Sequence, residues 1–573
     1  MLNRRQLLTG ATASALFPFT LAALATTKAR TVGAALSPAL TTVFDQIVDG
    51  QLRISPESAT SFGLDKGKYA SAKRLLDDRS LAGRAATKRF TAQCLAALEA
   101  CDRSKFTPTD TISYETVIDT LRVQAAADKR FDAVANAFYP YALSQLTGAY
   151  LEIPDLLDGE HQIHAREDAE TYLARLGAFA TVLDQEIEAV RHDTAAGVRP
   201  PAFVLEKLLV QLRALRGQPA AKSSLVQSLV RRTAEQKIGG DWDARASAVY
   251  TKAVQPALDR QIALVESLRS SATADAGAWR LPDGAAYYAS ALRTWTTSDM
   301  PAEEIHKVGL ERVAELSHAI DEALKAQSLS TGSVGTRLQA LAQDARFRYV
   351  NSDEGRAKVM ADIKARIAAV KAKLPQYFGT LPKTDLRIER VPVVSEAGRS
   401  IAYYSWPSMD GTRPGTFFIN LRNPAEISSW SLPTTVFHEA LPGHHLQLAL
   451  QAEANMHLLR KMSFYSAYSE GWGLYAEQLA DEMGMYENDP FGRIGYLQAQ
   501  LYRAARLVLD TGLHLKRWSR EQSIRYYMDV VGDHESVATT EVERYCVWPG
   551  QACTYMLGKL AWERLREEAK ARE

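Results

Sequence analysis

The chain has 573 residues, which is enough for one large domain or for about two to three ordinary domains with an ample core. Its hydrophobic and charged fractions, 46% and 24%, are those of a soluble globular protein. The formal net charge of +1 gives no sign of a nucleic-acid partner or of a polybasic membrane surface, so we expect neither.

The N-terminal residues 1–29 have the pattern of an export signal. Arg4 and Arg5 precede a modestly apolar stretch, and an A-x-A sequence occurs at residues 23–25. Paired arginines in this position are typical of twin-arginine signals, while an ordinary secretory signal and an uncleaved anchor are alternatives. No cysteine follows the apolar stretch closely, which argues against a lipid anchor. We therefore expect a periplasmic or otherwise exported protein with a cleaved signal and no stable membrane insertion afterwards.

Helical periodicity dominates the rest of the chain, and the predicted fold class is mainly α. Apolar residues three and four positions apart predict a series of helices. These segments are 40–52, 81–101, 168–191, 203–215, 246–270, 302–326 and 353–374. Small and polar residues accumulate at 272–282, so we divide the mature chain into an N-terminal helical half, 30–280, and a C-terminal catalytic half, 281–573. We expect the two halves to share one cleft.

Strand character is confined to three short segments. Residues 385–394, 401–406 and 416–421 carry β-branched or aromatic residues between Gly, Pro and Ser. A small sheet that leads into a metal-binding helix is a common layout in zinc peptidases, whose edge strand can pair with an extended substrate. A purely structural hairpin is the alternative.

The four cysteines form two pairs, Cys94 with Cys101 and Cys546 with Cys553, each seven residues apart. On a straight helix this spacing separates the Cα atoms by about 10.5 Å, beyond the roughly 7 Å limit for a disulfide. We therefore expect buried free thiols. A bridge between Cys546 and Cys553 stays open, because Pro-Gly between them can form a turn.

The strongest functional signal is the stretch His-Glu-Ala-Leu-Pro-Gly-His-His at residues 438–445, which holds three of the eleven histidines. Neutral imidazoles can hold a zinc ion, and an adjacent carboxylate can accept a proton from water. The spacing differs from the common H-E-x-x-H helix, because Pro442 stands where the second histidine would be. Pro442 cannot donate a hydrogen bond to the carbonyl of His438, so the helix predicted from about residue 431 to 454 must kink or bulge there.

The helix geometry decides between two candidates for the second ligand. On an unbroken helix His444 lies about 240° around the axis from His438, whereas His445 lies on nearly the same face but about 10.5 Å further along. If Pro442 and Gly443 loop out, His444 takes the position of the second histidine. The bulge favours His438 and His444 as the metal ligands, with His445 behind the ligands or facing the substrate.

A third ligand is required, because a catalytic zinc ion takes three protein ligands and leaves one position open. Glu470 is the next carboxylate in a distinctive setting, and Glu477 lies two turns further on, where it can orient a ligand. Gly471 and Gly473 lie between them and cost about 1 kcal/mol each in a helix relative to alanine. We expect these glycines to allow a close approach, by the first helix or by the substrate backbone.

The remaining catalytic roles are assigned to Glu439 and to the segment from Arg544 onward. Glu439 adjoins the first ligand and is the predicted general base. Tyr545 and Tyr555 are candidate donors to an oxyanion. The candidate substrate-binding side chains, beside the already named His445, are Arg544, Gln551 and Lys559.

Three motifs together, at residues 438–447, 470–477 and 544–551, resemble the bacterial family called domain of unknown function 885. The resemblance extends over nearly the whole mature chain. Members of this family look like distant relatives of the thimet-oligopeptidase and angiotensin-converting-enzyme types of zinc peptidase, and of carboxypeptidases with a deep helical channel. It implies a large helical zincin-like fold, with a deep central cleft and a small sheet next to the metal-binding helix. It also implies that His438, His444 and Glu470 hold one zinc ion per chain and that Glu439 is the base.

The function expected from these observations is that of an exported zinc-dependent peptidase acting on short peptides. One alternative is a metal-dependent hydrolase of other amides or esters, including modified peptides. The other is a peptide-binding pseudoenzyme, although a protein that only binds peptides has no need of Glu439 beside the metal.

Overall fold

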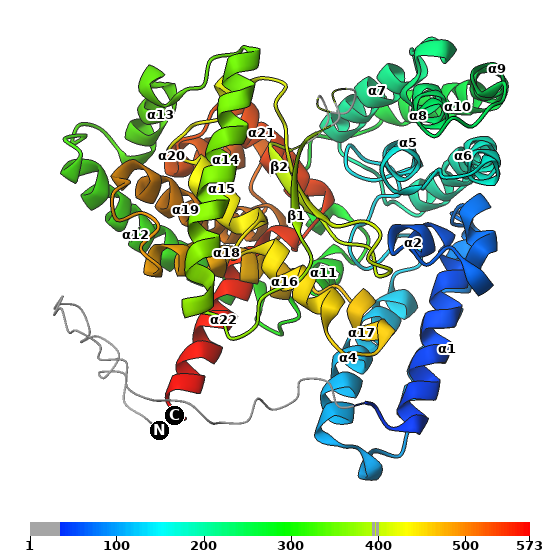
Figure 1. The fold of residues 1–573 in the computed structure, drawn as a ribbon, viewed down its shortest axis with the longest axis horizontal. Helices are drawn as coiled ribbons and strands as arrows, with labels where there is room; N and C mark the ends of the chain where they lie inside the picture. Colours follow the sequence, from blue (N-terminus) through cyan, green and yellow to red (C-terminus); the bar gives the residue numbers. More distant parts are fainter. Residues whose placement is uncertain (1–34, 392, 394–395, 397–399, 573) are drawn as a thin grey trace.

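The computed structural model describes residues 35–572 apart from 392, 394–395 and 397–399, and it is mainly helical (Figure 1). The predicted export signal at residues 1–29 lies outside the described residues. Within the described part of the chain, no helix is both long enough and apolar enough to cross a membrane. The predicted fold class, mainly α with a small sheet, is confirmed.

The helices of the first 300 residues include long pairs that pack side by side. The long predicted helix at 168–191 is observed as Arg166–Ala195, and its buried face includes Tyr172, Leu176 and Phe179. The helices in this part are α1 (Pro38–Ile54), α2 (Pro56–Ser61), α3 (Leu81–Glu99), α4 (Pro108–Arg130), α5 (Ala149–Asp155), α6 (Arg166–Ala195), α7 (Ala202–Arg216), α8 (Ser224–Glu235), α9 (Trp242–Val249), α10 (Gln255–Arg269) and α11 (Gly284–Thr296).

The remaining helices include the two that contain the histidine motif. They are α12 (Ala302–Ala326), α13 (Val334–Gln343), α14 (Asp353–Lys373), α15 (Leu432–Glu439), α16 (His444–Glu453), α17 (Leu458–Met462), α18 (Ser466–Glu482), α19 (Pro490–His514), α20 (Arg520–Val531), α21 (Glu535–Val547) and α22 (Thr554–Lys570). The closest packing partners are α12 with α19 and α18 with α22.

The sheet has three strands in the order β1-β3-β2, and each lies within a predicted segment or one residue from it. The strands are β1 (Leu386–Arg390), β2 (Ala402–Ser405) and β3 (Gly415–Ile419). β3 is central, parallel to β1 and antiparallel to β2, and its Phe417 and Ile419 are fully buried. Since α16 packs on β3 and α15 packs on β2, the sheet lies directly beside the histidine motif, as predicted.

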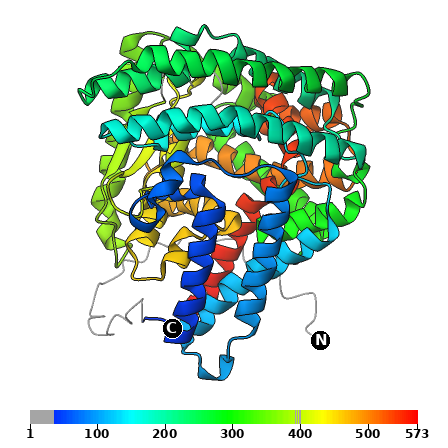
Figure 2. The same cartoon turned by 90° about the vertical axis from the view of Figure 1, so that its right-hand side faces the viewer.

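The N-terminal helices α1 to α10 occupy one side of the molecule and most of the later helices occupy the other, with α11 between them (Figure 1). In Figure 2 the blue helices α1 and α3 stand below the teal α6, which crosses above their upper ends. The hydrophobic core includes residues from both groups of helices, because Leu459 and Met462 of α17 belong to the hydrophobic cluster of α1, α3 and α4. The segment just before α18 is thereby anchored in the N-terminal helices.

The four cysteines are free thiols, as predicted, and all except the half-buried Cys101 are buried. The Cys546 thiol donates to the carbonyl oxygen of Val542 at 3.2 Å. The bridge that the sequence left open between Cys546 and Cys553 is not formed.

Candidate metal centre

The histidine motif forms two helices rather than one bulged helix, which corrects the prediction of a continuous helix to residue 454. α15 ends at Glu439 and α16 begins at His444. Pro442 lacks the N–H that would continue the first helix, and Gly443 packs so tightly that a Cβ there would lie 1.9 Å from the carbonyl oxygen of His438. The indole of Trp472 fixes the connection by donating to the carbonyl of Pro442 at 3.0 Å.

This break brings His438, His444 and Glu470 together from α15, α16 and α18. The Oε2 atom of Glu470 lies 3.5 Å from Nε2 of His438 and 3.4 Å from Nε2 of His444. The two imidazole rings are nearly perpendicular, with centroids 4.8 Å apart. Three potential ligand atoms, all within 4.8 Å of one another, therefore point to a common centre, and this cluster contains His444 and not His445.

Glu477 fixes the orientation of His438. Its Oε1 accepts a hydrogen bond from Nδ1 of His438 at 2.8 Å, and its Oε2 accepts from Thr434 at 2.8 Å and from Gln500 at 3.2 Å. A proton on Nδ1 leaves the Nε2 lone pair of His438 directed at the common centre. At protein metal sites, the ring nitrogen of a histidine that does not bind the metal usually donates a hydrogen bond to a carboxylate or a similar acceptor.

Two glycines in α18 permit the close contacts that the sequence predicts. A Cβ on Gly473 would lie 2.8 Å from the ring of His438, so only glycine leaves room for this ligand against α18. A Cβ on Gly471 would lie 2.4 Å from the backbone of Gly558, where α18 and α22 cross. The predicted approach of the first helix is confirmed at Gly473, while Gly471 accommodates α22.

The residues fit a zinc ion by their chemistry. Two imidazole nitrogens and one carboxylate oxygen form a known catalytic donor set, and three such lone pairs at this distance repel one another unless a cation or protons lie between them. Burial lowers the pKa of His438, but its hydrogen bonds to Glu470 and Glu477 raise the pKa to about 10. Burial raises the pKa of Glu470, but His438 and His444 bring the pKa well below its usual value. Both shifts lie in the direction that favours positive charge at the centre.

The candidate centre opens into a cavity of about 520 Å³. Half-buried Glu439 lines this cavity together with the three ligand residues, in the position expected of the predicted base. Tyr555 and Arg544 also line it, and the ring of Tyr555 stacks on that of His438 with centroids 6.4 Å apart.

Four of the predicted catalytic or substrate-binding residues do not line this cavity. His445 faces the sheet, where its Nδ1 lies 3.0 Å from the hydroxyl of Tyr404. Buried Tyr545 donates to Glu541, and the side-chain oxygen of Gln551 accepts from Arg544 at 2.8 Å. These side chains therefore hold neighbours of the cavity in place.

Lys559 is the fourth of these residues. It is buried on α22 and forms an ion pair with Glu563 at 3.3 Å. Burial lowers its pKa.

Arg503 and Arg506, which were not predicted as site residues, lie beside the predicted Arg544 in the cavity, and we define these three residues as its basic wall. Arg503 and Arg506 lie one turn apart on α19, and Arg544 lies on α21. Glu541 is the acidic residue of this wall and accepts from Arg506 at 2.8 Å. The available signal was the position of Arg506 inside the apolar run 504–509, where a charged residue needs a buried partner.

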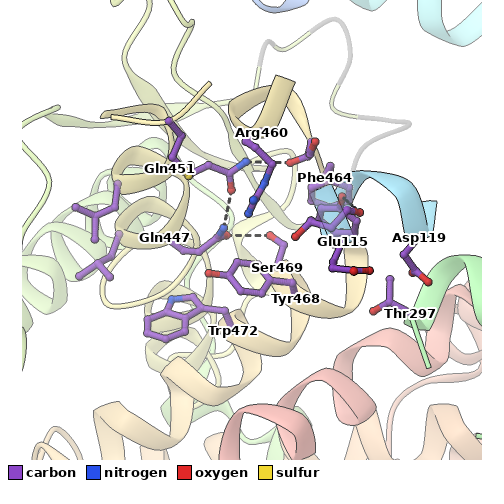
Figure 3. A pocket seen from close by; sticks show the side chains of 16 residues that line it. Glu115, Asp119, Thr297, Gln447, Gln451, Arg460, Phe464, Tyr468, Ser469 and Trp472 are labelled. Carbon is purple, nitrogen blue, oxygen red and sulfur yellow. Dashed lines mark hydrogen bonds between the residues drawn. The ribbon is translucent and has the colours of Figure 1, made fainter. Parts of the chain in front are cut away.

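A second, larger cavity of about 740 Å³ lies beside the first (Figure 3). Gln447 of α16 and Ser469 of α18 are joined by a hydrogen bond of 3.1 Å on its wall. Ser469 and Phe464 line both cavities. Because Ser469 directly precedes Glu470, this larger space adjoins the metal centre rather than containing it.

The fold and the site define a large helical protein with a candidate metal centre of two histidines and one glutamate. Residues 56–573 match the family described as "Bacterial protein of unknown function (DUF885)", and the chain belongs to this family, as its motifs predict. It is similar to the crystal structure of a "putative lipoprotein" from Colwellia psychrerythraea, with 32% identity over 93% of each chain and a TM-score of 0.90.

A second similar structure is a "putative lipoprotein of unknown function" from Shewanella oneidensis. It has 19% identity over 93% of this chain and 94% of the other, with a TM-score of 0.67, and shows likeness of fold alone. No match was found among curated proteins.

Proposed function

We propose that this protein is an exported, zinc-dependent metallopeptidase that hydrolyses short peptides in an enclosed cleft. The observation that carries the proposal is the convergence of His438, His444 and Glu470 on one centre in a cavity that Glu439 also lines. A protein that only bound peptides would gain nothing from this glutamate beside the ligands.

The residues divide the chemistry among them. Zinc held by His438, His444 and Glu470 would polarise the scissile carbonyl and make water a better nucleophile near neutral pH. Glu439 takes the proton of the attacking water and passes it to the leaving amine. Tyr555 is the donor best placed for the developing oxyanion, because it lines the cavity beside His438.

The shape of the site favours short, extended substrates. Its volume of about 520 Å³ lies in the range of small-ligand pockets, roughly 300–1,000 Å³. Ala402, Tyr403 and Tyr404 of the edge strand β2 form part of its wall, so a peptide can lie along this strand.

Export is the proposed route to the site of action. The two similar structures carry the description "putative lipoprotein", which denotes exported proteins. The twin-arginine pattern at residues 1–29 agrees with export, and the periplasm with a cleaved signal is the proposed location.

The test compares the wild type with Glu439→Gln on a random peptide library, with products read by mass spectrometry. We expect about one zinc ion per chain in both proteins and a turnover about 10²–10⁴-fold lower in the variant. Glu389→Gln, on exposed β1, is the matched control and should cleave like the wild type. Full activity of metal-free protein, or unchanged turnover in Glu439→Gln, would overturn the proposal.

A further inference from the structure

The basic wall carries more positive charge than its own acidic partner neutralises. Glu541 lies 2.8 Å from Arg506, and 3.9 Å from Arg544. Arg503 forms no ion pair within the described residues, and it packs over Tyr502 at 4.4 Å instead. Burial raises the pKa of Glu541, but Arg506 and Arg544 bring the pKa to about 2, so this carboxylate is ionised. Within the wall itself one carboxylate thus faces three guanidinium groups, whereas the other carboxylates that line the cavity, Glu439 and Glu470, belong to the metal centre.

The wall also has buried donors that lack acceptors. Among the described residues, Nη1 of Arg506, Nε of Arg503 and Nε of Arg544 have no hydrogen-bond partner. Arg506 is only 2% exposed. Buried polar groups in proteins are nearly always hydrogen-bonded, and guanidinium groups at a cavity wall that keep a spare N–H donor are suited to a carboxylate.

A single aromatic ring separates this wall from the metal centre. The ring of Tyr555 lies 6.4 Å from that of His438, and the guanidinium carbon of Arg506 lies 4.5 Å from the same tyrosine ring. One extended residue spans about 3.4 Å, so no more than about three residues fit between the centre and the wall.

We infer that the basic wall binds the free C-terminal carboxylate of the substrate, so that the protein releases fragments of one to three residues from the C-terminal ends of peptides. This inference rests on the proposed function. The inference specifies the end of the peptide from which cleavage proceeds, because a C-terminus bound at Arg506 fixes which peptide bond lies at the metal centre.

The experiment uses three forms of one mixed pentapeptide pool: the free acid, the C-terminal amide, and an amide that ends in glutamate. For the wild type we expect kcat/KM to be at least about 10-fold higher for the acid than for either amide, the effect of one charge-assisted hydrogen bond. The products should lack one to three C-terminal residues. Equal cleavage of acid and amide would overturn the inference and leave the peptidase standing, and preference for the glutamate amide would assign the wall to acidic side chains.

Variants and a binding measurement separate the two proposals. Arg503→Gln should lose most of the preference for the acid, whereas Arg231→Gln, an exposed arginine on α8, should keep it. When the zinc-loaded Glu439→Gln variant is immobilised, it should bind the free-acid peptides more tightly than either amide form. If it does so while the wild type cleaves nothing, the wall binds carboxylates and the peptidase proposal fails. If it retains all three forms equally, the inference fails.

Discussion

Glu477→Gln tests whether the carboxylate behind His438 controls the metal centre. The change keeps the size of the side chain and removes its charge. If the amide oxygen faces Nδ1 of His438, the amide N–H₂ meets the Thr434 hydroxyl and the donating amide of Gln500, which then keeps only the carbonyl oxygen of Leu474 as an acceptor. If the amide is turned around, its N–H₂ faces Nδ1 and forces the proton of His438 onto Nε2, where it blocks the ligand lone pair.

Either orientation weakens metal binding. Loss of such a carboxylate typically lowers metal affinity 10–100-fold, which corresponds to about 1.4–2.7 kcal/mol. We expect this loss for Glu477→Gln in a competition titration with a zinc chelator of known affinity. Glu482→Gln, one turn further on the same helix but exposed and paired with Arg566, is the matched control and should bind zinc like the wild type.

The reasoning fails if Glu477→Gln binds zinc as tightly as the wild type while circular dichroism shows a native fold. A matching loss in Glu482→Gln would also refute it, because the effect would then come from the general charge of α18. A loss confined to Glu477→Gln would assign the effect to the hydrogen bond with His438.

Two further predictions concern packing and pH. Gly473→Ala places a Cβ 2.8 Å from the ring of His438 and should lower zinc affinity by at least about 10-fold, whereas Gly379→Ala, with nothing within 4 Å, should not. A zinc titration that gives equal affinities would contradict this. Burial lowers the pKa of His514 to about 4, and its Nδ1 accepts a hydrogen bond from the backbone N–H of Ala278 at 2.8 Å. His514 therefore stays neutral in the folded state at pH values below about 6.5, where the same side chain is protonated in the unfolded state. Stability is therefore lost as pH falls from 6.5 toward 4. Between pH 7 and 5 the free energy of unfolding, from urea titrations, should fall about 2 kcal/mol more in the wild type than in His514→Gln, and parallel slopes would contradict it.

Local chemistry made the approach of His444 to His438 predictable. Pro442 cannot continue a helix, and this one fact separated His444 from His445. Strand positions also followed from local composition. The two-helix break differs from the predicted bulge because Gly443 packs onto the carbonyl of His438, a contact that spacing alone does not reveal.

Residues whose role depends on distant partners were not predictable. Arg506 reaches the cavity wall because Glu541, from another helix, accepts its hydrogen bond. His445 turns toward Tyr404 because α16 packs on the sheet. In both cases tertiary packing selects the direction of the side chain, and helical periodicity contains no information about the partner.

Phe464 has a consequence for the size of the substrate that the cavity can accept. This residue, 50% exposed, lines both the cavity of the metal centre and its larger neighbour, and its ring lies 5.5 Å from that of Trp406. A cavity of about 520 Å³, with this aromatic pair on its wall, is far too small to admit a folded protein. On the proposed function, selection by size makes the protein a late-acting enzyme. It spares intact neighbours in the same compartment and depends on other proteases to supply the fragments it consumes.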